Sequence, residues 1–148
     1  MEELKIRLAS EEDMSAVMRL IGQPDMSPDN RLTSGEVGKL FKTITSTPFH
    51  RLYVVETANL IIATFALITV QQLSHNGAKS MVIEDMVVST EMQGRGIGKR
   101  IMDFAANEAQ SQGCYKMILS SGNARTQAHN FYENLGYKKD GIRFAINL

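Results

Sequence analysis

A glycine-rich stretch, Gln93–Arg100, has the residue types that could bind an anion. Glycine stands at every second position from Gly94 to Gly98, and basic residues stand between and after the glycines. Glycine adopts positive φ and lets a ligand approach the backbone closely. Apolar residues with helical spacing begin at Ile97, so the amide N–H groups of a first helical turn point outward there. The stretch is therefore predicted to bind a phosphate-like anion.

Two adjacent carboxylates, Glu84 and Asp85, interrupt an apolar, β-branched run from Met81 to Val88. The run is predicted to be a mostly buried strand. Burial can raise the pKa of a carboxylate, which would suit it to accept a proton near neutral pH. Successive strand residues point to opposite faces, so one of the two would face a substrate. We favour Glu84, although a bulge in the strand could reverse that choice.

Elements on both sides of this stretch follow from apolar periodicity and turn residues. Before it, we expect a strand at Leu4–Leu8, a helix opened by Ser10 and Asp13 and ending at Ile21, a helix at Ser34–Ser46, and strands at Leu52–Glu56 and Leu60–Val70. After it, we expect a helix to Gln110, a strand at Tyr115–Ser120, a helix at Ala124–Leu135 and a final strand at Arg143–Leu148. The order β-α-α-β-β-β-α-β-α-β predicts a mixed α/β sheet with antiparallel and parallel parts.

Length and composition limit the possible functions. The chain has 148 residues, with 43% hydrophobic and 22% charged residues and no net charge. These values are typical of one ordinary globular domain over residues 1–148, and they do not favour nucleic acid or an anionic membrane as a partner. A single cysteine and three scattered histidines give no metal-binding pattern, and no signal peptide or membrane span is evident. We expect a cytoplasmic protein without a metal.

The glycine stretch does not fit the common nucleotide motifs. It lacks the Gly-Lys-Ser/Thr of a P-loop, and Lys99 stands where a dinucleotide fingerprint has its third glycine. A second motif near the C-terminus is more specific in combination with it. Gln93-x-x-Gly96-x-Gly98, together with Ala128-x-x-Phe131-Tyr132-Glu133-x-x-Gly136-Tyr137, resembles the GNAT N-acetyltransferase superfamily. Residues 83–88 and 113–116 resemble its glucosamine-6-phosphate N-acetyltransferase branch and bacterial relatives.

The resemblance implies the GNAT fold, a sheet of six to seven strands flanked by about four helices, and acetyl-CoA as cosubstrate. It implies that the backbone of Met86, Val87 and Val88 pairs with the pantetheine chain and that the turn holds the pyrophosphate. The implied turn residues are Gln93, Gly94, Arg95, Gly96, Ile97, Gly98 and Lys99. On the other side of the thioester, the implied contacts are Ala128, Phe131 and Tyr132.

The same resemblance implies a direct transfer to a primary amine. Glu84 or Asp85 would accept the proton of the amine, and Tyr132 would protonate the thiolate that leaves. His129 is an alternative base, although a packing role is expected for it. Arg125 stands where many members of the family have asparagine, seven residues before the tyrosine, so that contact is not carried over.

Several alternatives stay open at this point. The acceptor could be an amino sugar, an aminoglycoside, a polyamine, an amino acid or a protein amine. The chain could also be an acyl-CoA-binding module without catalytic activity. Related enzymes often form dimers through C-terminal strands, so a homodimer is possible.

Overall fold

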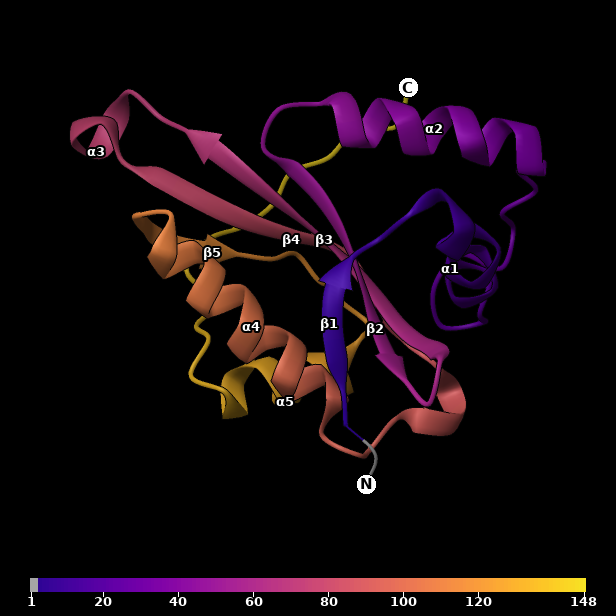
Figure 1. The fold of residues 1–148 in the computed structure, drawn as a ribbon. Helices are drawn as coiled ribbons and strands as arrows, with labels where there is room; N and C mark the ends of the chain where they lie inside the picture. The colour runs from indigo at the N-terminus through magenta and orange to yellow at the C-terminus, as the bar shows by residue number, and fades with distance from the viewer. Residues whose placement is uncertain (1–2) are drawn as a thin grey trace. The chain divides into compact units, whose positions relative to one another are not determined.

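The structure is a computed structural model that describes residues 3–148 (Figure 1). Internal contacts divide the chain into two units, one ending at Ile118 and the other spanning Leu119–Leu148. The first unit contains the sheet, and the second contains one helix, α5 (Thr126–Asn134). The prediction of a single domain is not decided by this division and stays a prediction.

The sheet of the first unit has five strands in the order β1-β2-β3-β4-β5. Their bounds are β1 Lys5–Leu8, β2 His50–Thr57, β3 Leu60–Gln71, β4 Lys79–Val88 and β5 Cys114–Ile118. The first four strands pair antiparallel, and β5 pairs parallel to β4. This pairing confirms the predicted mixed sheet. Short turns join β2, β3 and β4 and make them antiparallel, whereas the helix between β4 and β5 lets that pair run parallel.

Helices cover both faces of this sheet (Figure 1). The helices of the first unit are α1 Met14–Ile21, α2 Ser34–Ser46, the short α3 Ser74–Gly77 and α4 Ile97–Ser111. Two 3-10 turns, η1 at Glu11–Asp13 and η2 at Thr90–Met92, precede α1 and α4. In α3, His75 and Asn76 have positive φ, so this segment is a tight turn between β3 and β4 rather than a regular helix.

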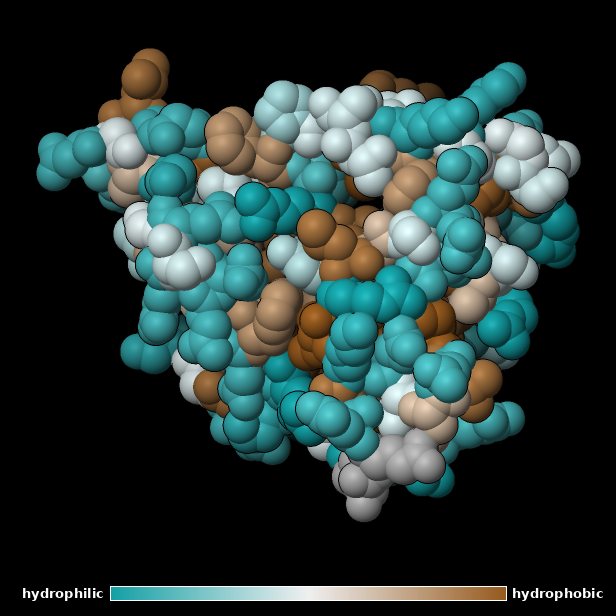
Figure 2. All heavy atoms as spheres, in the orientation of Figure 1, coloured by the Kyte–Doolittle hydropathy of each residue, from teal (hydrophilic) through white to brown (hydrophobic). Residues whose placement is uncertain are grey.

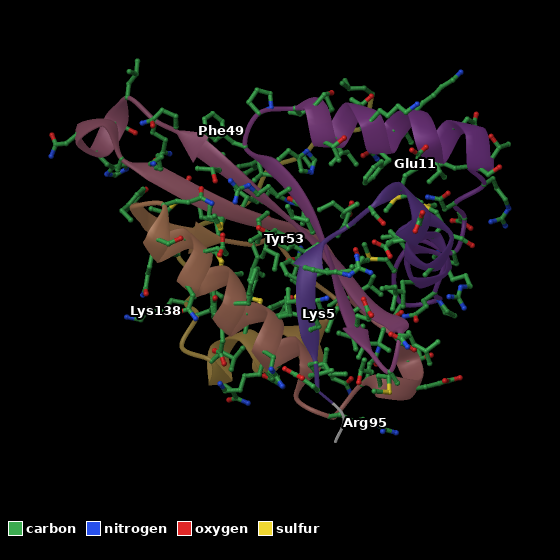
Figure 3. All side chains as sticks on the ribbon, in the orientation of Figure 1. Lys5, Glu11, Phe49, Tyr53, Arg95 and Lys138 are labelled. Carbon is green, nitrogen blue, oxygen red and sulfur yellow. The ribbon has the colours of Figure 1, made fainter. Side chains whose placement is uncertain are left out.

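Neighbouring residues of β2 contribute to different layers of the core, because successive side chains of a strand point to opposite faces of the sheet. Tyr53 stacks on Phe65 of β3 at 5.1 Å, and both rings contact Phe104 of α4 edge-on. Val54 instead packs with residues of α1 and α2, including Val17 and Val37. Figure 3 labels Tyr53 near the middle of the sheet. The sheet thus packs against α4 on one face and against α1 and α2 on the other.

A charged network ties β1 to the start of α1. Arg7 donates to both carboxylate oxygens of Asp13, at 2.7 and 3.0 Å, and to Glu56 at 2.9 Å. The backbone N–H and the hydroxyl of Ser10 also donate to Asp13. The Arg7 guanidinium lowers the pKa of Asp13 to about 2, although burial of the carboxylate opposes the shift. The network anchors the first strand to the first helix.

The prediction of a final strand at Arg143–Leu148 is wrong, because the structure has no strand there. Residues 138–148 contain neither helix nor strand, so the sheet has five strands rather than six or seven. Apolar and polar residues do alternate there, but Ile142, Phe144 and Ile146 are each at least 82% exposed. A strand forms only against a partner, and no described strand pairs with this segment. The strand predicted at Tyr115–Ser120 also ends earlier, at Ile118.

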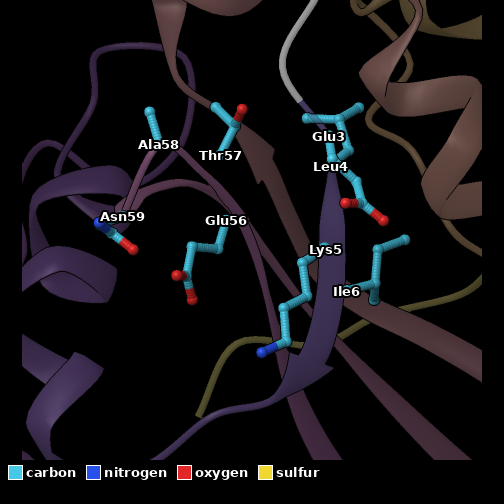
Figure 4. Close-up of a pocket in the computed structure, with 8 residues that line it drawn as sticks. All are labelled: Glu3, Leu4, Lys5, Ile6, Glu56, Thr57, Ala58 and Asn59. Atoms are coloured by element: carbon cyan, nitrogen blue, oxygen red, sulfur yellow. The ribbon is translucent and has the colours of Figure 1, made fainter.

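The face of the molecule in Figure 2 is mostly hydrophilic. Figure 2 shows hydrophilic side chains over most of the visible face, with hydrophobic ones in small groups between them. No helix within residues 3–148 is long and apolar enough to cross a membrane. An open groove with a volume of about 490 Å³ lies between β1 and the turn that joins β2 to β3 (Figure 4). Its lining residues, which include Lys5, Glu56 and Asn59, contain none of the predicted site residues.

Candidate active site

Half of β4 has no strand on one of its sides. The parallel pairing with β5 runs only from Lys79 to Val82 of β4, where Val82 pairs with Ile118. On its other side, β4 pairs with β3 as far as Val88. Residues Ile83–Val88 therefore present backbone N–H and C=O groups along an edge that no strand of the described chain covers. Such an edge can accept an extended ligand by backbone hydrogen bonds.

A β-bulge lies in this uncovered half of β4. Ala66 of β3 pairs with Glu84, whereas Thr64 pairs with Val87, so β4 carries one residue more than β3 over the same interval. The extra residue is accommodated at Asp85, whose φ is +50°. A bulge leaves backbone groups outside the regular ladder, and such groups can point at a ligand.

The bulge also decides where Glu84 lies. Ala66 pairs with Leu52 as well as with Glu84, and directly paired residues share a face of the sheet. Leu52 packs against the α1 and α2 cluster, so Glu84 lies on the face that α1 and α2 cover. Both Glu84 and Asp85 are exposed, although the strand around them is buried. The expectation that these two carboxylates are buried in the strand is therefore wrong.

The glycine stretch is a turn that leads into α4, as predicted. Gly94 has φ +73° and Gly96 has φ +79°, and Gly96 is the residue that precedes the first helical turn. Ile97 is buried and fixes the start of α4 against the sheet. Arg95 lies at the outer end of the turn (Figure 3), and Lys99 pairs with Asp103 at 2.6 Å on the exposed face of α4. Because Lys99 is paired with Asp103, the backbone amides of the turn are the groups that we expect to meet an anion.

Two residues that the sequence analysis did not identify contact this region. Gln23 and Asp25, in the loop after α1, make hydrogen bonds to Val88, Thr90 and Gln93. No sequence motif marks this loop, and a separation of 65 positions between Gln23 and Val88 hides the contact from any local pattern. The loop after α1 is therefore part of the structure that supports the glycine turn.

The second unit carries the tyrosine motif on α5. Ala128 and Tyr132 are one helical turn apart, and the ring of Phe131 lies 5.1 Å from that of Tyr132. All three side chains are partly buried. Burial raises the pKa of Tyr132, and the positive charge of Arg125 lowers it to a smaller extent. The phenol therefore stays protonated at neutral pH, as a proton donor must.

His129 has a structural contact within the second unit. Its Nε2 lies 2.8 Å from the carbonyl oxygen of Gly122, which can only accept a hydrogen bond, so this nitrogen carries the proton. The contact joins α5 to the segment that precedes it. This geometry agrees with the packing role expected for His129. Among the described residues, no group of three or more His, Cys, Asp or Glu side chains could hold a metal ion.

An uncovered strand edge that runs into a glycine turn and a helix N-terminus is the arrangement that the GNAT resemblance leads us to expect for an acyl-group transferase, and comparison with known proteins agrees. Residues 48–139 match a family model described as an acetyltransferase (GNAT) domain. The chain therefore belongs to the GNAT acetyltransferase family, and it is an N-acetyltransferase.

Individual relatives agree with this assignment. Glucosamine 6-phosphate N-acetyltransferase of Arabidopsis thaliana is 29% identical, over 97% of this chain and 96% of the relative. An aminoalkylphosphonate N-acetyltransferase of Salmonella typhimurium is 37% identical over a shorter region, 43% of this chain and 41% of the relative. A solved putative acetyltransferase from Agrobacterium tumefaciens has a TM-score of 0.90 and 26% identity, covering 97% of this chain and 99% of that chain. The resemblance to the family inferred from the two motifs is confirmed.

Proposed function

We propose that this enzyme transfers the acetyl group of acetyl-CoA to the primary amine of a small polar molecule, an amino sugar or a similar amine, within a ternary complex. The observation that carries the proposal is the uncovered edge of β4, which runs directly into the glycine turn. An extended pantetheine chain can pair with the backbone of Met86–Val88, and a pyrophosphate can then meet the amides of residues 93–99. Ala128, Phe131 and Tyr132 would flank the thioester. The open strand edge and the amides of the turn therefore offer the hydrogen-bonding groups that the pantetheine and the pyrophosphate would need.

Bound acetyl-CoA would supply an acyl group activated as a thioester. An alkyl amine with a pKa near 10 is only about 0.1% neutral at pH 7, so a base increases the reactive fraction. Glu84 is the residue proposed to accept the proton, directly or through water, because it lies on a defined face and is open to solvent. Asp85 is the alternative, although its place in the bulge suggests a role in shaping the strand.

Two other groups would handle the charge that develops during attack. The backbone N–H of Met86, beside the bulge, is proposed to donate to the carbonyl oxygen as negative charge forms on it. Tyr132 is proposed to give its phenolic proton to the departing thiolate, whose conjugate thiol has a pKa of about 8.5. The ammonium nitrogen loses two protons as it becomes an amide N–H. One is released through Glu84 to solvent, and the second replaces the proton that Tyr132 gives to sulfur, so that one proton is released overall.

The names of two relatives narrow the acceptor. One acts on glucosamine 6-phosphate and the other on aminoalkylphosphonates, so both names describe an amine that also carries a phosphorus oxyanion. We therefore propose an amine with a phosphate or phosphonate group as the first acceptor class to test. A protein amine is the alternative acceptor, and cytoplasmic localisation stays a prediction of the sequence.

A thiol-release assay over a panel of amines tests this proposal. The panel pairs each phosphorylated amine with its unphosphorylated counterpart, glucosamine 6-phosphate with glucosamine for example, and adds an aminoglycoside, a polyamine and a peptide. We expect acetyl-dependent thiol release with the phosphorylated member of a pair and a much weaker rate with the other. Turnover that prefers the peptide would favour the protein-amine alternative. Absence of acetyl-CoA binding would contradict the proposal altogether.

A further inference from the structure

Four groups from three segments of the first unit form a closed ring of hydrogen bonds at the end of β4. The side-chain amide of Gln23 donates to Asp25 Oδ1 at 3.2 Å and to the carbonyl oxygen of Val88 at 3.1 Å. The side-chain amide of Gln93 donates to Asp25 Oδ2 at 2.9 Å and to the same carbonyl at 3.1 Å. The ring joins the loop after α1 to the last residue of β4 and the first residue of the glycine stretch.

Both glutamines of this ring use both hydrogens of their side-chain amides within it. An amide NH₂ group has two hydrogens, and in both glutamines one points at the carboxylate and the other at the carbonyl. The two carboxylate oxygens of Asp25 accept one bond each. Rotating either amide by 180° would place its oxygen against two acceptors, so the ring fixes the orientation of both side chains.

The ring lies at the uncovered edge of β4. The backbone N–H of Ser89 donates to the carbonyl of Ile62 on β3, at 2.8 Å. In a trans peptide the C=O of one residue and the N–H of the next point in opposite directions. The Val88 carbonyl therefore points away from β3, toward the side that β5 leaves open. There the two glutamine amides satisfy it, and the hydrogen-bonding edge of the strand ends at this point.

The same loop also holds the segment between β4 and the glycines. The Oε1 of Gln23 accepts the backbone N–H of Thr90 at 3.3 Å, and Thr90 begins the 3-10 turn η2. Gln23 thus contacts the chain both at Val88 and two residues later. The direction in which the backbone leaves β4 and enters the turn depends on these contacts.

We propose that Gln23 and Asp25 are positioning residues for the cosubstrate. They hold residues 88–93 so that the open edge of β4 and the amides of the glycine turn lie along one path. This inference rests on the proposed function, because that path is the one assigned to the pantetheine and pyrophosphate of acetyl-CoA. Neither residue needs to contact the cosubstrate itself.

The direction in which CoA affinity changes when Asp25 is neutralised separates a positioning role from a purely electrostatic one. Asp25 carries a negative charge close to a turn that is proposed to bind a polyanion, so its charge by itself weakens anion binding. Replacing it with a neutral residue should tighten CoA binding if charge is the only effect. Positioning predicts the opposite, because asparagine would place its amide NH₂ group against the donor of either Gln23 or Gln93 and open the ring on that side.

The test compares Asp25→Asn with Asp29→Asn. Asp29 lies in the same loop, is exposed, and forms no hydrogen bond or ion pair within residues 3–148, so its substitution removes the same charge without opening the ring. Calorimetry with CoA measures affinity directly. We expect the dissociation constant to rise about tenfold for Asp25→Asn, as loss of hydrogen bonds to a charged group predicts, and to hold or fall slightly for Asp29→Asn.

Two further readouts distinguish positioning from a general loss of structure. Without any ligand, hydrogen exchange at the amides of residues 90–98 should be faster in Asp25→Asn, while exchange in β2 and β3 stays unchanged. In steady-state kinetics, KM for acetyl-CoA should rise while kcat and KM for the amine change by less than about twofold. Gln23→Leu, which removes all three hydrogen bonds of this side chain without a charge change, should reproduce the pattern.

Equal or tighter CoA binding by both Asp25→Asn and Gln23→Leu would overturn the inference, as would uniformly faster exchange throughout the sheet. A wild-type protein that binds CoA, together with variants that behave like it, would refute the positioning role alone. A wild-type protein that does not bind CoA would refute the proposed function instead.

Discussion

The guanidinium of Arg7 holds both carboxylate oxygens of Asp13, at 2.7 and 3.0 Å, and the Asp13 side chain is only 10% exposed. This pair joins the first strand to the start of the first helix. Because the pair needs an ionised Asp13, the stability of the protein should fall at low pH.

The pKa of Asp13 is lowered from 3.8 to about 2 in the folded protein. A group with a lowered folded-state pKa stabilises the protein fully above its unfolded-state pKa and loses that contribution as the pH falls through the folded-state value. We expect a loss of about 2 kcal/mol of unfolding free energy between pH 4 and pH 2. Urea unfolding at several pH values measures it. Asp13→Asn should be less stable at pH 7 and flatter over this range, whereas Asp29→Asn should follow the wild type.

Removal of the Tyr132 hydroxyl should slow turnover without abolishing it. Thiolate can also be protonated by water, so Tyr132→Phe is expected to lower kcat by about ten- to a hundredfold while the affinity for acetyl-CoA changes little. Tyr115→Phe, at a half-exposed position of β5, is the matched control. Steady-state kinetics with chemistry confirmed as the slow step would decide: an unaltered kcat in Tyr132→Phe would remove this residue from the mechanism.

The two carboxylates of β4 should differ in their effects. Glu84→Gln is expected to lower kcat/KM for the amine at pH 7, and the defect should shrink toward pH 10, because the amine there is neutral without a base. Asp85→Asn should keep most activity, since asparagine tolerates the positive φ of the bulge. Glu91→Gln, at an exposed site in η2, controls for loss of charge. A defect of Glu84→Gln that is the same at every pH would argue against its role as base.

The backbone conformation at Gly96 should matter more than the space around it. A Cβ at this position would meet no atom within 4 Å, but φ is +79°. Gly96→Ala is therefore expected to cost about 1–2 kcal/mol from backbone strain and to weaken CoA binding by distorting the turn. Gly141→Ala, equally uncrowded and without a positive φ, should have no comparable effect. Thermal unfolding measures the loss of stability, and calorimetry measures the affinity for CoA. Equal results for Gly96→Ala and Gly141→Ala would contradict the assignment of the turn.

The exposed C-terminal alternation predicts self-association. Ile142, Phe144 and Ile146 resemble one face of a strand without a partner, and an unpaired strand can pair with a second copy of the chain. We expect light scattering to find a dimer at micromolar concentration and Phe144→Lys to weaken it. Asn147→Lys adds the same charge at an alternate position and should leave it intact. A wild-type monomer would count against this dimer.

Local sequence determined the elements and the family. Helical spacing after Ile97, glycines at positions of positive φ and the β-branched run at Met81–Val88 are local properties, and each element formed where they predicted it. The two motifs that identify the GNAT family are equally local. The helix with Tyr132 likewise depends on residues next to it in the chain.

Tertiary structure alone decided what depends on pairing between distant segments. The register of β4 against β3 placed the bulge at Asp85 and put Glu84 on the face covered by α1 and α2. The same kind of non-local contact brought Gln23 and Asp25 to Val88 and Gln93. Alternation at Arg143–Leu148 predicted a strand that did not form, because a periodic pattern defines a face but does not supply a partner for it.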